Sequence, residues 1–315
     1  MLDKRKSLFV RRFVIAAYVL LACLTGVPSA QADWRKDLGT FRIGISATDT
    51  GTLTPTEIKK LESGYSTALG MPAEVKIFRD YPALIDAHAS SRIEYAIYSS
   101  IAYATAWLLC ECIEPLVAPV QTNGATGIRS ALVLNSGKAF TRLDLNGMRI
   151  GIPEKGSISG FAIPMVEYVI GTRKLSEDDA FILHLSDTSS MISAFSDGKI
   201  DGFFGWIYSD GAGSLAVSGL MDTGSVSTIS VSGKKTDIKM PWVSGLLRYG
   251  PHAIRKNLPP EARDALQSFF SAIGSTDVDL LSQFQPTNIA KFVPATHAEY
   301  KLAVVTTKFL ATVSK

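Results

Sequence analysis

"RIGIPEKGSISGFAIP", residues 149–164, joins a short apolar strand to an apolar helix through a turn of glycine and serine. Two serines, Ser157 and Ser159, stand where the helix should begin. The first turn of a helix has N–H groups without intrahelical partners and roughly half a positive charge, so it binds anions without a basic side chain. One serine at this place is explained by helix capping alone. A run of two serines between two glycines favours an anion site, with capping as the alternative.

Strands and helices alternate on both sides of this stretch. Alternating apolar residues and short apolar runs predict strands at 41–46, 74–78, 94–100, 130–135, 149–153, 181–185 and 200–206. Start signals, such as the capping box Thr54-Pro55-Thr56-Glu57, predict helices that begin near residues 54, 80, 161, 187 and 259. Two consecutive sets of strand, helix and strand indicate an α/β protein of two lobes, each a mostly parallel sheet flanked by helices, with a ligand cleft between the lobes. No internal repeat is visible in the sequence.

The restart of this pattern after residue 128 suggests where the lobes begin and end. We expect 33–128 to form the first part of lobe 1 and 129–242 to form lobe 2. The remaining residues, 243–315, should return to lobe 1 and supply the C-terminal helices. This organisation predicts two crossings of the chain between the lobes.

The first 32 residues have the composition of a secretory signal peptide. Basic residues precede an uncharged run at 13–27, and Ala30-Gln31-Ala32 supplies an A-x-A cleavage site. The run is shorter than the roughly 20 residues that cross a bilayer. We therefore expect cleavage before Asp33 and a periplasmic protein. Cys23 lies in a loose lipobox, so lipoprotein anchoring is the second interpretation.

Charge and cysteine content narrow the function classes. The full chain has a net charge of +3, but the signal segment holds five of its basic residues, so the mature part is close to neutral and should not bind nucleic acid. The mature part keeps Cys110 and Cys112. A bridge between them would be strained in an extended tripeptide, since Cα atoms beyond about 7 Å cannot be joined. We expect half-buried thiols, with a bridge second and a metal site last.

Motifs for catalysis are weak. The run 156–160 resembles the nucleophile elbow G-x-S-x-G, but Ile158 occupies the place of the nucleophile. Neither H-E-x-x-H nor a Walker loop is present, and the four histidines are scattered. We expect no catalytic residues, no metal and no cofactor. A secreted hydrolase that uses Ser157 or Ser159 remains the alternative from another class.

A second polar rim follows the predicted strand at 94–100. Ser99, Ser100 and Tyr103 lie at or beyond the end of this strand. Open α/β sheets bind ligands outside the carboxyl ends of their strands. The rim in the first lobe and the serine turn in the second should therefore face one cleft.

Several stretches, in this order, resemble the periplasmic phosphonate-, phosphite- and phosphate-type substrate-binding proteins of ABC importers. They are "FRIGIS" (41–46), "ALGMPAEVKIFRDYPALIDA" (68–87), "YAIYSSIAYATA" (95–106), "IRSALVLNSGKAFTRLDLNGMRIGIPEKGSISGFAIP" (128–164) and "ISAFSDGKIDG" (192–202). The resemblance covers nearly all of the mature chain. It implies the type II periplasmic binding protein fold.

The resemblance also implies ligand-binding positions. Ser157 and Ser159, with the backbone amides of Ile158, Ser159 and Gly160, match the anion loop of the family. Tyr81 matches a tyrosine that often contacts the ligand.

The chain departs from the family at several positions. Ile158 replaces the central threonine of the anion loop, and Ile128 replaces an aromatic residue. Ser186 stands where some members have a histidine that helps to hold the anion. Asp210 is the nearest candidate for a carboxylate that pairs with the amine of an aminophosphonate. These departures make the ligand less defined than the fold.

The resemblance implies a protein that captures a small, phosphonate-like oxyanion and delivers it to an ABC permease. We expect a monomer. A sulfonate or another small ligand, or a sensor role without transport, are the alternatives within binding.

Overall fold

The computed structural model describes residues 33–50, 53–138, 145–208, 215–217, 220–222, 228–231, 234–284 and 288–313. The chain divides into an N-terminal unit that ends at Leu38 and a main unit from Gly39 to Lys315. The described part of the N-terminal unit contains helix α2 (Trp34–Leu38). The predicted signal peptide, 1–32, lies outside the described residues.

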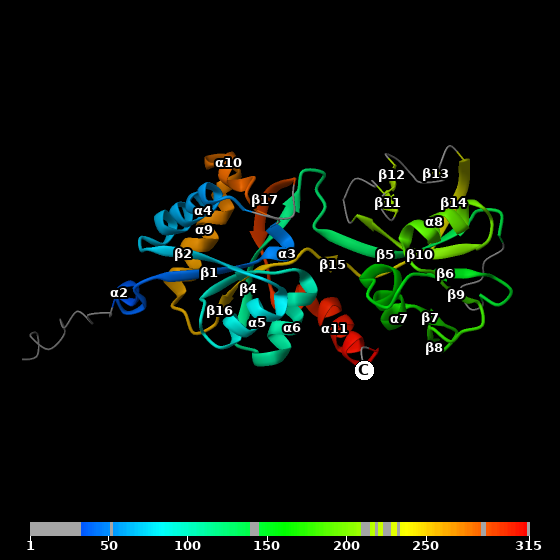
Figure 1. The fold of residues 1–315 in the computed structure, drawn as a ribbon, viewed down its shortest axis with the longest axis horizontal. Coiled ribbons are helices and arrows are strands. Elements are labelled where there is room, and N and C mark those ends of the chain that lie inside the picture. Colours follow the sequence, from blue (N-terminus) through cyan, green and yellow to red (C-terminus); the bar gives the residue numbers. More distant parts are fainter. Residues whose placement is uncertain are drawn as a thin grey trace, which may run out of the picture. The chain divides into compact units, whose positions relative to one another are not determined.

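The first sheet of the main unit has six strands, with a parallel part and an antiparallel part. Their order is β17 (Ile289–Pro294), β4 (Ile113–Gln121), β16 (His252–Arg255), β3 (Tyr95–Ile97), β1 (Phe41–Ser46) and β2 (Ala73–Phe78). β1 pairs with β2 and β3 in parallel, whereas β16 and β17 pair antiparallel to their neighbours. Figure 1 shows α4 (Pro55–Leu69) and α9 (Pro260–Thr276) on one side of this sheet, and α5 (Tyr81–Ala89) and α6 (Ser100–Cys110) on the other.

The second sheet has the same mixed character. Its path is β13 (Thr228–Val231), β14 (Lys234–Val243), β5 (Gly127–Asn135), β10 (Gly202–Tyr208), β6 (Ile150–Ile152) and β9 (Ile182–His184), and β15 (Leu247–Arg248) pairs with β5 beside this path. Only the β10–β6 and β6–β9 pairs are parallel. Both sheets are therefore mixed rather than mostly parallel, because strands from distant parts of the chain join each one antiparallel.

Short elements complete the described part of the chain. They are α3 (Ala47–Thr50), the π-helix η1 (Ile158–Ala162), α7 (Ile163–Glu167), β7 (Val169–Ile170), β8 (Arg173–Lys174), α8 (Thr188–Ser196), β11 (Leu215–Val217), β12 (Leu220–Asp222), α10 (Val278–Leu281), the 3-10 helix η2 (His297–Tyr300) and α11 (Lys301–Val313). The strands β7 and β8 form one two-stranded sheet, and β11 and β12 form another. The C-terminal helix α11 packs against α6 and also against η1 and α7.

Local sequence signals explain why the helices begin where they do. The hydroxyl of Thr54 accepts the N–H of Glu57, and the N–H of Thr54 donates to the Glu57 carboxylate, so the predicted capping box at the start of α4 is confirmed. Asp80 caps α5 by accepting the N–H of Ala83. Asp187 caps α8 in the same way. The caps at Asp80 and Asp187 fix the starts of α5 and α8 next to the ends of β2 and β9.

The two sheets share an ion-pair arrangement, in which a buried carboxylate meets a partly exposed arginine, and it reveals a structural repeat. Arg42 in β1 pairs with Glu94, and Arg149, directly before β6, pairs with Asp201; each pair is 52 residues apart. In both pairs the carboxylate also accepts the backbone N–H of its own arginine. Both arginines begin the sequence Arg-Ile-Gly-Ile. The two βαβ units therefore repeat one design, and the shared tetrapeptide corrects the expectation that the sequence holds no internal repeat.

Cys110 and Cys112 form a disulfide bond. This finding corrects the expectation of half-buried thiols, which assumed an extended tripeptide. Helix α6 ends at Cys110, and Glu111 adopts the left-handed conformation with a φ of 48°. This turn brings the two Cα atoms to 5.0 Å, well inside the distance that a bridge allows.

Candidate functional site

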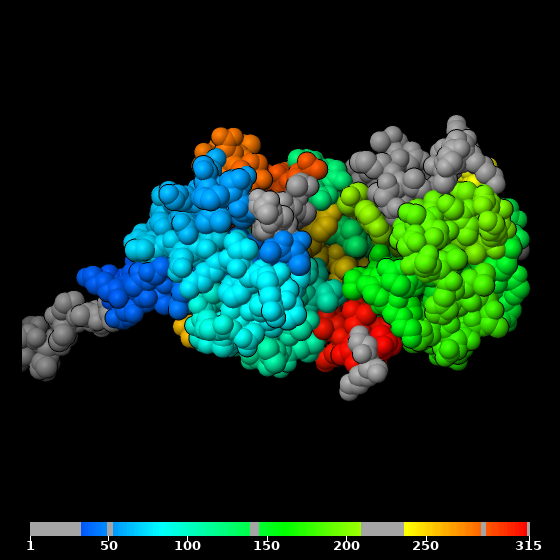
Figure 2. Space-filling view, viewed as in Figure 1, coloured from blue at the N-terminus to red at the C-terminus, as the bar shows by residue number. Residues whose placement is uncertain are grey.

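A pocket of about 560 Å³ lies where several chain segments meet. Its lining comes from α3, the start of α5, the segment 97–101, β5 at Ile128, η1 at Ile158 and the segment 247–250. Figure 2 shows a hollow in the surface whose floor is coloured gold, the colour of residues near 250. The pocket therefore draws its walls from elements of both sheets.

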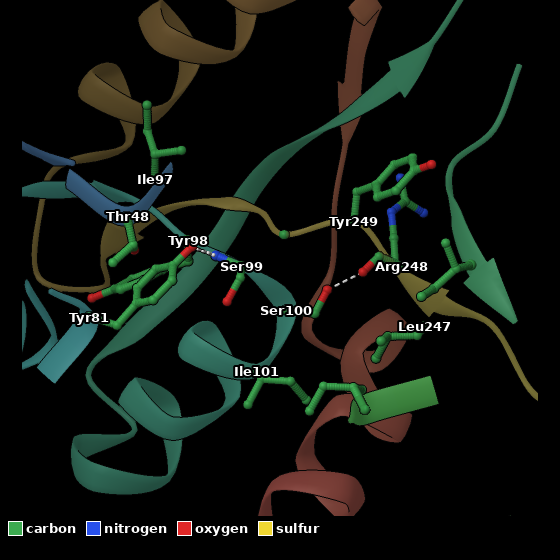
Figure 3. A pocket seen from close by; sticks show the side chains of 13 residues that line it. Thr48, Tyr81, Ile97, Tyr98, Ser99, Ser100, Ile101, Leu247, Arg248 and Tyr249 are labelled. Carbon is green, nitrogen blue, oxygen red and sulfur yellow. Dashed lines mark hydrogen bonds between the residues drawn. The ribbon is translucent and has the colours of Figure 1, made fainter. Parts of the chain in front are cut away.

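Tyr81 and Ser99 meet at one side of this pocket. Tyr81 is the first residue of α5, and its hydroxyl accepts the backbone N–H of Ser99 at 2.9 Å. Figure 3 shows both side chains beside the cavity. The tyrosine that the family resemblance predicts as a ligand contact thus lines the pocket together with the predicted serine rim.

Ser99 and Ser100 have structural tasks in addition to their place at the pocket. The Ser99 hydroxyl accepts the N–H of Ala102 at 3.2 Å and so caps α6. The Ser100 hydroxyl donates to the carbonyl of Arg248, which fixes the return segment against α6 (Figure 3). The predicted strand 94–100 is therefore shorter than expected, because its last residues cap and begin a helix.

The serine turn reaches the pocket through Ile158 alone. The Ser157 hydroxyl accepts the N–H of Gly160 at 3.2 Å, so this serine caps the helix. Ser159 accepts a hydrogen bond at its carbonyl, and its hydroxyl has no partner within the described residues. The helix begins at Ile158, earlier than the predicted start near residue 161. It ends at Glu167, because Val169–Ile170 forms a hairpin strand.

Gly160 is required by the packing of the turn. A Cβ at this position would lie 2.5 Å from Cγ of Pro153 and 3.0 Å from Oγ of Ser157. The glycine therefore lets the first turn of the helix pack on Pro153, independently of any ligand.

Five described site residues that the sequence predicted are not in the pocket lining: Tyr103, Ser157, Ser159, Gly160 and Ser186. Tyr103 is fully buried, and its hydroxyl lies 2.9 Å from Nδ1 of His297. Ser186 donates to Asp187 at 2.9 Å and belongs to the cap of α8. Asp210 lies outside the described residues. Ile128, the departure from an aromatic residue, does line the pocket.

Ser130 positions the serine turn and was not identified from the sequence. It is fully buried in β5, and its hydroxyl donates to the carbonyl of Ser159 at 2.6 Å. Its backbone N–H donates to the hydroxyl of Ser244 at 2.8 Å. The sequence shows only a serine at the start of a predicted apolar strand, which does not reveal that Ser130 holds the carbonyl of Ser159.

Arg248 is the second residue that the sequence did not reveal. It lines the pocket, and its side chain is only 11% exposed. Its guanidinium pairs with Glu299, whose other oxygen accepts the N–H of Thr296 at 2.7 Å. The Nε of Arg248 is buried and has no hydrogen-bond partner within the described residues. Arg248 is the single formally charged residue in the described lining, and its partner lies too far along the chain for any local motif to link them.

Tyr98 presents its ring to the pocket rather than its hydroxyl. The hydroxyl lies 3.1 Å from Nδ1 of His88, and Nε2 of His88 lies 3.3 Å from the carbonyl of Glu94. Because a carbonyl only accepts, Nε2 carries the proton and Nδ1 accepts the hydroxyl of Tyr98. Burial lowers the pKa of His88 to about 3, so the ring stays neutral and holds Tyr98 in place.

The described residues offer no clear catalytic or metal centre. No group of three His, Cys, Asp or Glu side chains is gathered as metal ligands in the part of the chain that the structure describes. His88 and His252 are buried, His184 contacts Glu177, and His297 contacts Tyr103. None of these histidines has a recorded contact with Ser157 or Ser159, so no general base serves a serine nucleophile within the described residues.

A family model described as "ABC transporter, phosphonate, periplasmic substrate-binding protein" matches residues 43–300. The chain belongs to this family. Members of the phosphonate-type binding protein family are periplasmic components of ABC transporters that bind a small ligand and work with a permease, and they are not enzymes. Within the described residues, no helix has the length and apolar character needed to span a membrane.

Solved structures confirm the fold of this family member. XAC2383 from Xanthomonas citri, solved bound to ATP, is 14% identical with a TM-score of 0.55 and covers 88% of this chain and 98% of that chain. Mh-p37 from Mycoplasma hyorhinis is 10% identical with a TM-score of 0.55 and covers 86% of this chain and 98% of that chain. At these identities the likeness shows the two-lobe type II periplasmic binding protein fold alone.

Proposed function

We propose that this protein captures a small, phosphonate-like oxyanion in the pocket at Arg248 and delivers it to an ABC permease. The observation that carries the proposal is the guanidinium of Arg248, the single charged group in the described lining, whose Nε has no hydrogen-bond partner within the described residues. Charge-assisted hydrogen bonds from guanidinium to phosphonate-like oxygens are strong and directional. The start of the helix at Ile158 supports the proposal, because its first N–H groups have no intrahelical acceptor.

The proposal includes the organisation of the whole chain. Residues 1–32 direct export and are removed, with anchoring through Cys23 as the alternative. Lobe 1 comprises 33–128 and 243–315, apart from the short strand β15, which pairs with β5 of the second sheet, and lobe 2 comprises 129–242. The near-neutral mature protein acts as a monomer and does not bind nucleic acid. The ligand lies against Tyr81, Ser99, Ser100 and Ile158, which line the pocket, with the amides of 158–159 and the hydroxyl of Ser159 as donors from the adjoining turn. Tyr103 and Ser186 support the site from outside the pocket lining.

Replacement of Arg248 tests the central contact. Arg248→Met should weaken binding of the best phosphonate about tenfold or more, since a charge-assisted hydrogen bond contributes roughly 1.5–3 kcal/mol. Glu299→Gln releases the guanidinium from its carboxylate partner and should leave binding unchanged or tighten it. Thermal-shift screening over phosphonates, phosphite, phosphate and sulfonates selects the ligand, and calorimetry measures the affinities. Equal weakening by both variants would show that the ion pair only supports the fold.

The two serines of the turn should behave differently from one another. Ser159→Ala removes a hydroxyl that has no partner within the described residues, so we expect about tenfold weaker binding with little change in stability. Ser157→Ala removes a helix cap and should cost about 1 kcal/mol of unfolding free energy. Calorimetry and urea unfolding on both variants separate the two effects. Unchanged affinity in Ser159→Ala would exclude its hydroxyl as a ligand contact.

A further inference from the structure

The pocket is larger and more apolar than an oxyanion alone requires. Its volume of about 560 Å³ lies within the range of sites for whole organic ligands, roughly 300–1,000 Å³. Aliphatic side chains from four separate segments form much of its wall, namely Ile97, Ile101, Ile128, Ile158 and Leu247. Figure 3 shows Ile101 and Leu247 on the same side of the cavity as Ser100. A ligand that only presents oxygens would leave this apolar surface in contact with water.

The polar groups of the pocket suit an anion and not a cation. Arg248 is the single charged residue in the described lining, and the carboxylate of Glu299 that pairs with it is not among the lining residues. Tyr98 contributes its ring, because its hydroxyl is engaged by His88. An ammonium group on the ligand would be desolvated beside a guanidinium and aliphatic walls, without a carboxylate partner among the described lining residues.

We propose that the ligand is an oxyanion with an uncharged, apolar substituent of about three carbons or more, and that the pocket discriminates against ligands that carry an ammonium group. This inference rests on the proposed function and specifies its ligand class. The oxyanion lies at Arg248, and the substituent lies against Ile97, Ile101 and Leu247. Binding then gains from the burial of each methylene and loses when a methylene is replaced by a charged nitrogen.

Two matched ligand pairs test this inference by calorimetry at pH 7. Propylphosphonate and 2-aminoethylphosphonate differ by a terminal methyl group against an ammonium group, and propanesulfonate and 2-aminoethanesulfonate differ in the same way. We expect the alkyl member to bind at least tenfold tighter in each pair that binds. Methylphosphonate should bind more weakly than propylphosphonate, by about fourfold for each methylene that is lost.

A charge placed in the wall should reverse the preference. Ile101 lies in the first turn of α6 and is partly buried, so Ile101→Glu introduces a carboxylate at a helix start that tolerates it. This variant should bind 2-aminoethylphosphonate more tightly than propylphosphonate. Ile101→Gln is the matched control, since it adds a polar group of the same length without a charge, and should weaken both ligands alike.

The results of these binding measurements distinguish a failure of this inference from a failure of the proposed function. Equal or tighter binding of the ammonium member by the unmodified protein would overturn the inference and leave oxyanion binding in place. Binding of propanesulfonate without any phosphonate would overturn the phosphonate-like head group and keep the apolar substituent. Absence of binding in both pairs would overturn the inference and the proposed oxyanion function together.

Discussion

Acidification from pH 7 to pH 5 is expected to lower the free energy of unfolding by about 4 kcal/mol, because two histidines are buried in the neutral form. His252 is fully buried among aromatic rings, with Phe270 and Phe292 both at 4.8 Å between ring centroids. Neither ring nitrogen of His252 has a hydrogen-bond partner within the described residues. His88 is fully buried beside Tyr98. Protonation of either ring would place a charge in the core.

The direction of this effect follows from the pKa values of the two states. Burial lowers the pKa of His88 and of His252 to about 3 in the folded protein, from an ordinary value of 6.5. Between these values the unfolded chain binds protons that the folded chain does not, so stability falls as the pH falls through this range. Each histidine removes about 1.4 kcal/mol per pH unit. Over the 1.5 units from the ordinary histidine pKa down to pH 5, two histidines give the expected loss of about 4 kcal/mol, a large part of a typical stability of about 5–15 kcal/mol.

Replacement of one histidine should halve this pH dependence. His252→Phe retains an aromatic ring in the cluster and removes the titrating group, so the slope between pH 6.5 and pH 5 should fall from about 2.7 to about 1.4 kcal/mol per pH unit. Urea unfolding followed by circular dichroism at four pH values measures it. His184→Gln, at an exposed position, is the control and should keep the full slope. An unchanged slope in His252→Phe would show that His252 does not drive acid unfolding.

The ion pairs of the repeated βαβ units give the second large effect. Arg42→Met should lower the free energy of unfolding by about 3–5 kcal/mol, because it leaves the carboxylate of Glu94 buried without a cation. The Glu94 side chain is only 4% exposed, and Arg42 is its sole cationic partner within the described residues. Methionine retains the apolar stem of arginine, so the loss reports the charge rather than the packing.

In the second βαβ unit, the equivalent substitution Arg149→Met should lower the free energy of unfolding by less than Arg42→Met does. Asp201 is also 4% exposed, but Lys138 contacts it at 2.9 Å in addition to Arg149. The hydrogen bond from Arg149 is the main cause that holds the pKa of Asp201 well below its usual range. After Arg149→Met the lysine still neutralises the carboxylate, so we expect a smaller loss than in Arg42→Met. The exposed pair of Lys60 and Asp279 is the control, where Lys60→Met should change stability by less than about 1 kcal/mol. Equal losses at all three positions would contradict this ranking.

Local signals allowed much of the fold to be predicted. The strand at 41–46 and the capping box at Thr54 depend on neighbouring residues alone, and both are confirmed. The antiparallel additions β16 and β17 depend on pairing with β4 across long stretches of chain, for which the sequence holds no local pattern. The mixed sheets were therefore missed, although the two-lobe architecture was identified.

The residues of the candidate site also divide into those that local sequence signals predicted and those that they did not. Tyr81, Ser99 and Ser100 follow strand ends, where the general rule for α/β sheets places ligands, and they line the pocket. Arg248 depends on Glu299, 51 residues further along the chain, and no local motif connects them. The disulfide was misjudged because the left-handed conformation of Glu111 is a property of the helix end and not of the tripeptide composition.

The Cys110–Cys112 bridge has a consequence for how the protein is prepared. Disulfides form in oxidising compartments and are kept reduced in the bacterial cytoplasm. Protein produced in the cytoplasm would therefore carry two thiols at the end of α6, separated by a single residue. Such a pair of thiolates is a ligand for soft metal ions, so we expect reduced material purified on a metal-affinity column to carry more metal than material with the bridge formed. Preparations from the periplasm and from the cytoplasm should be compared by thiol titration before any binding assay.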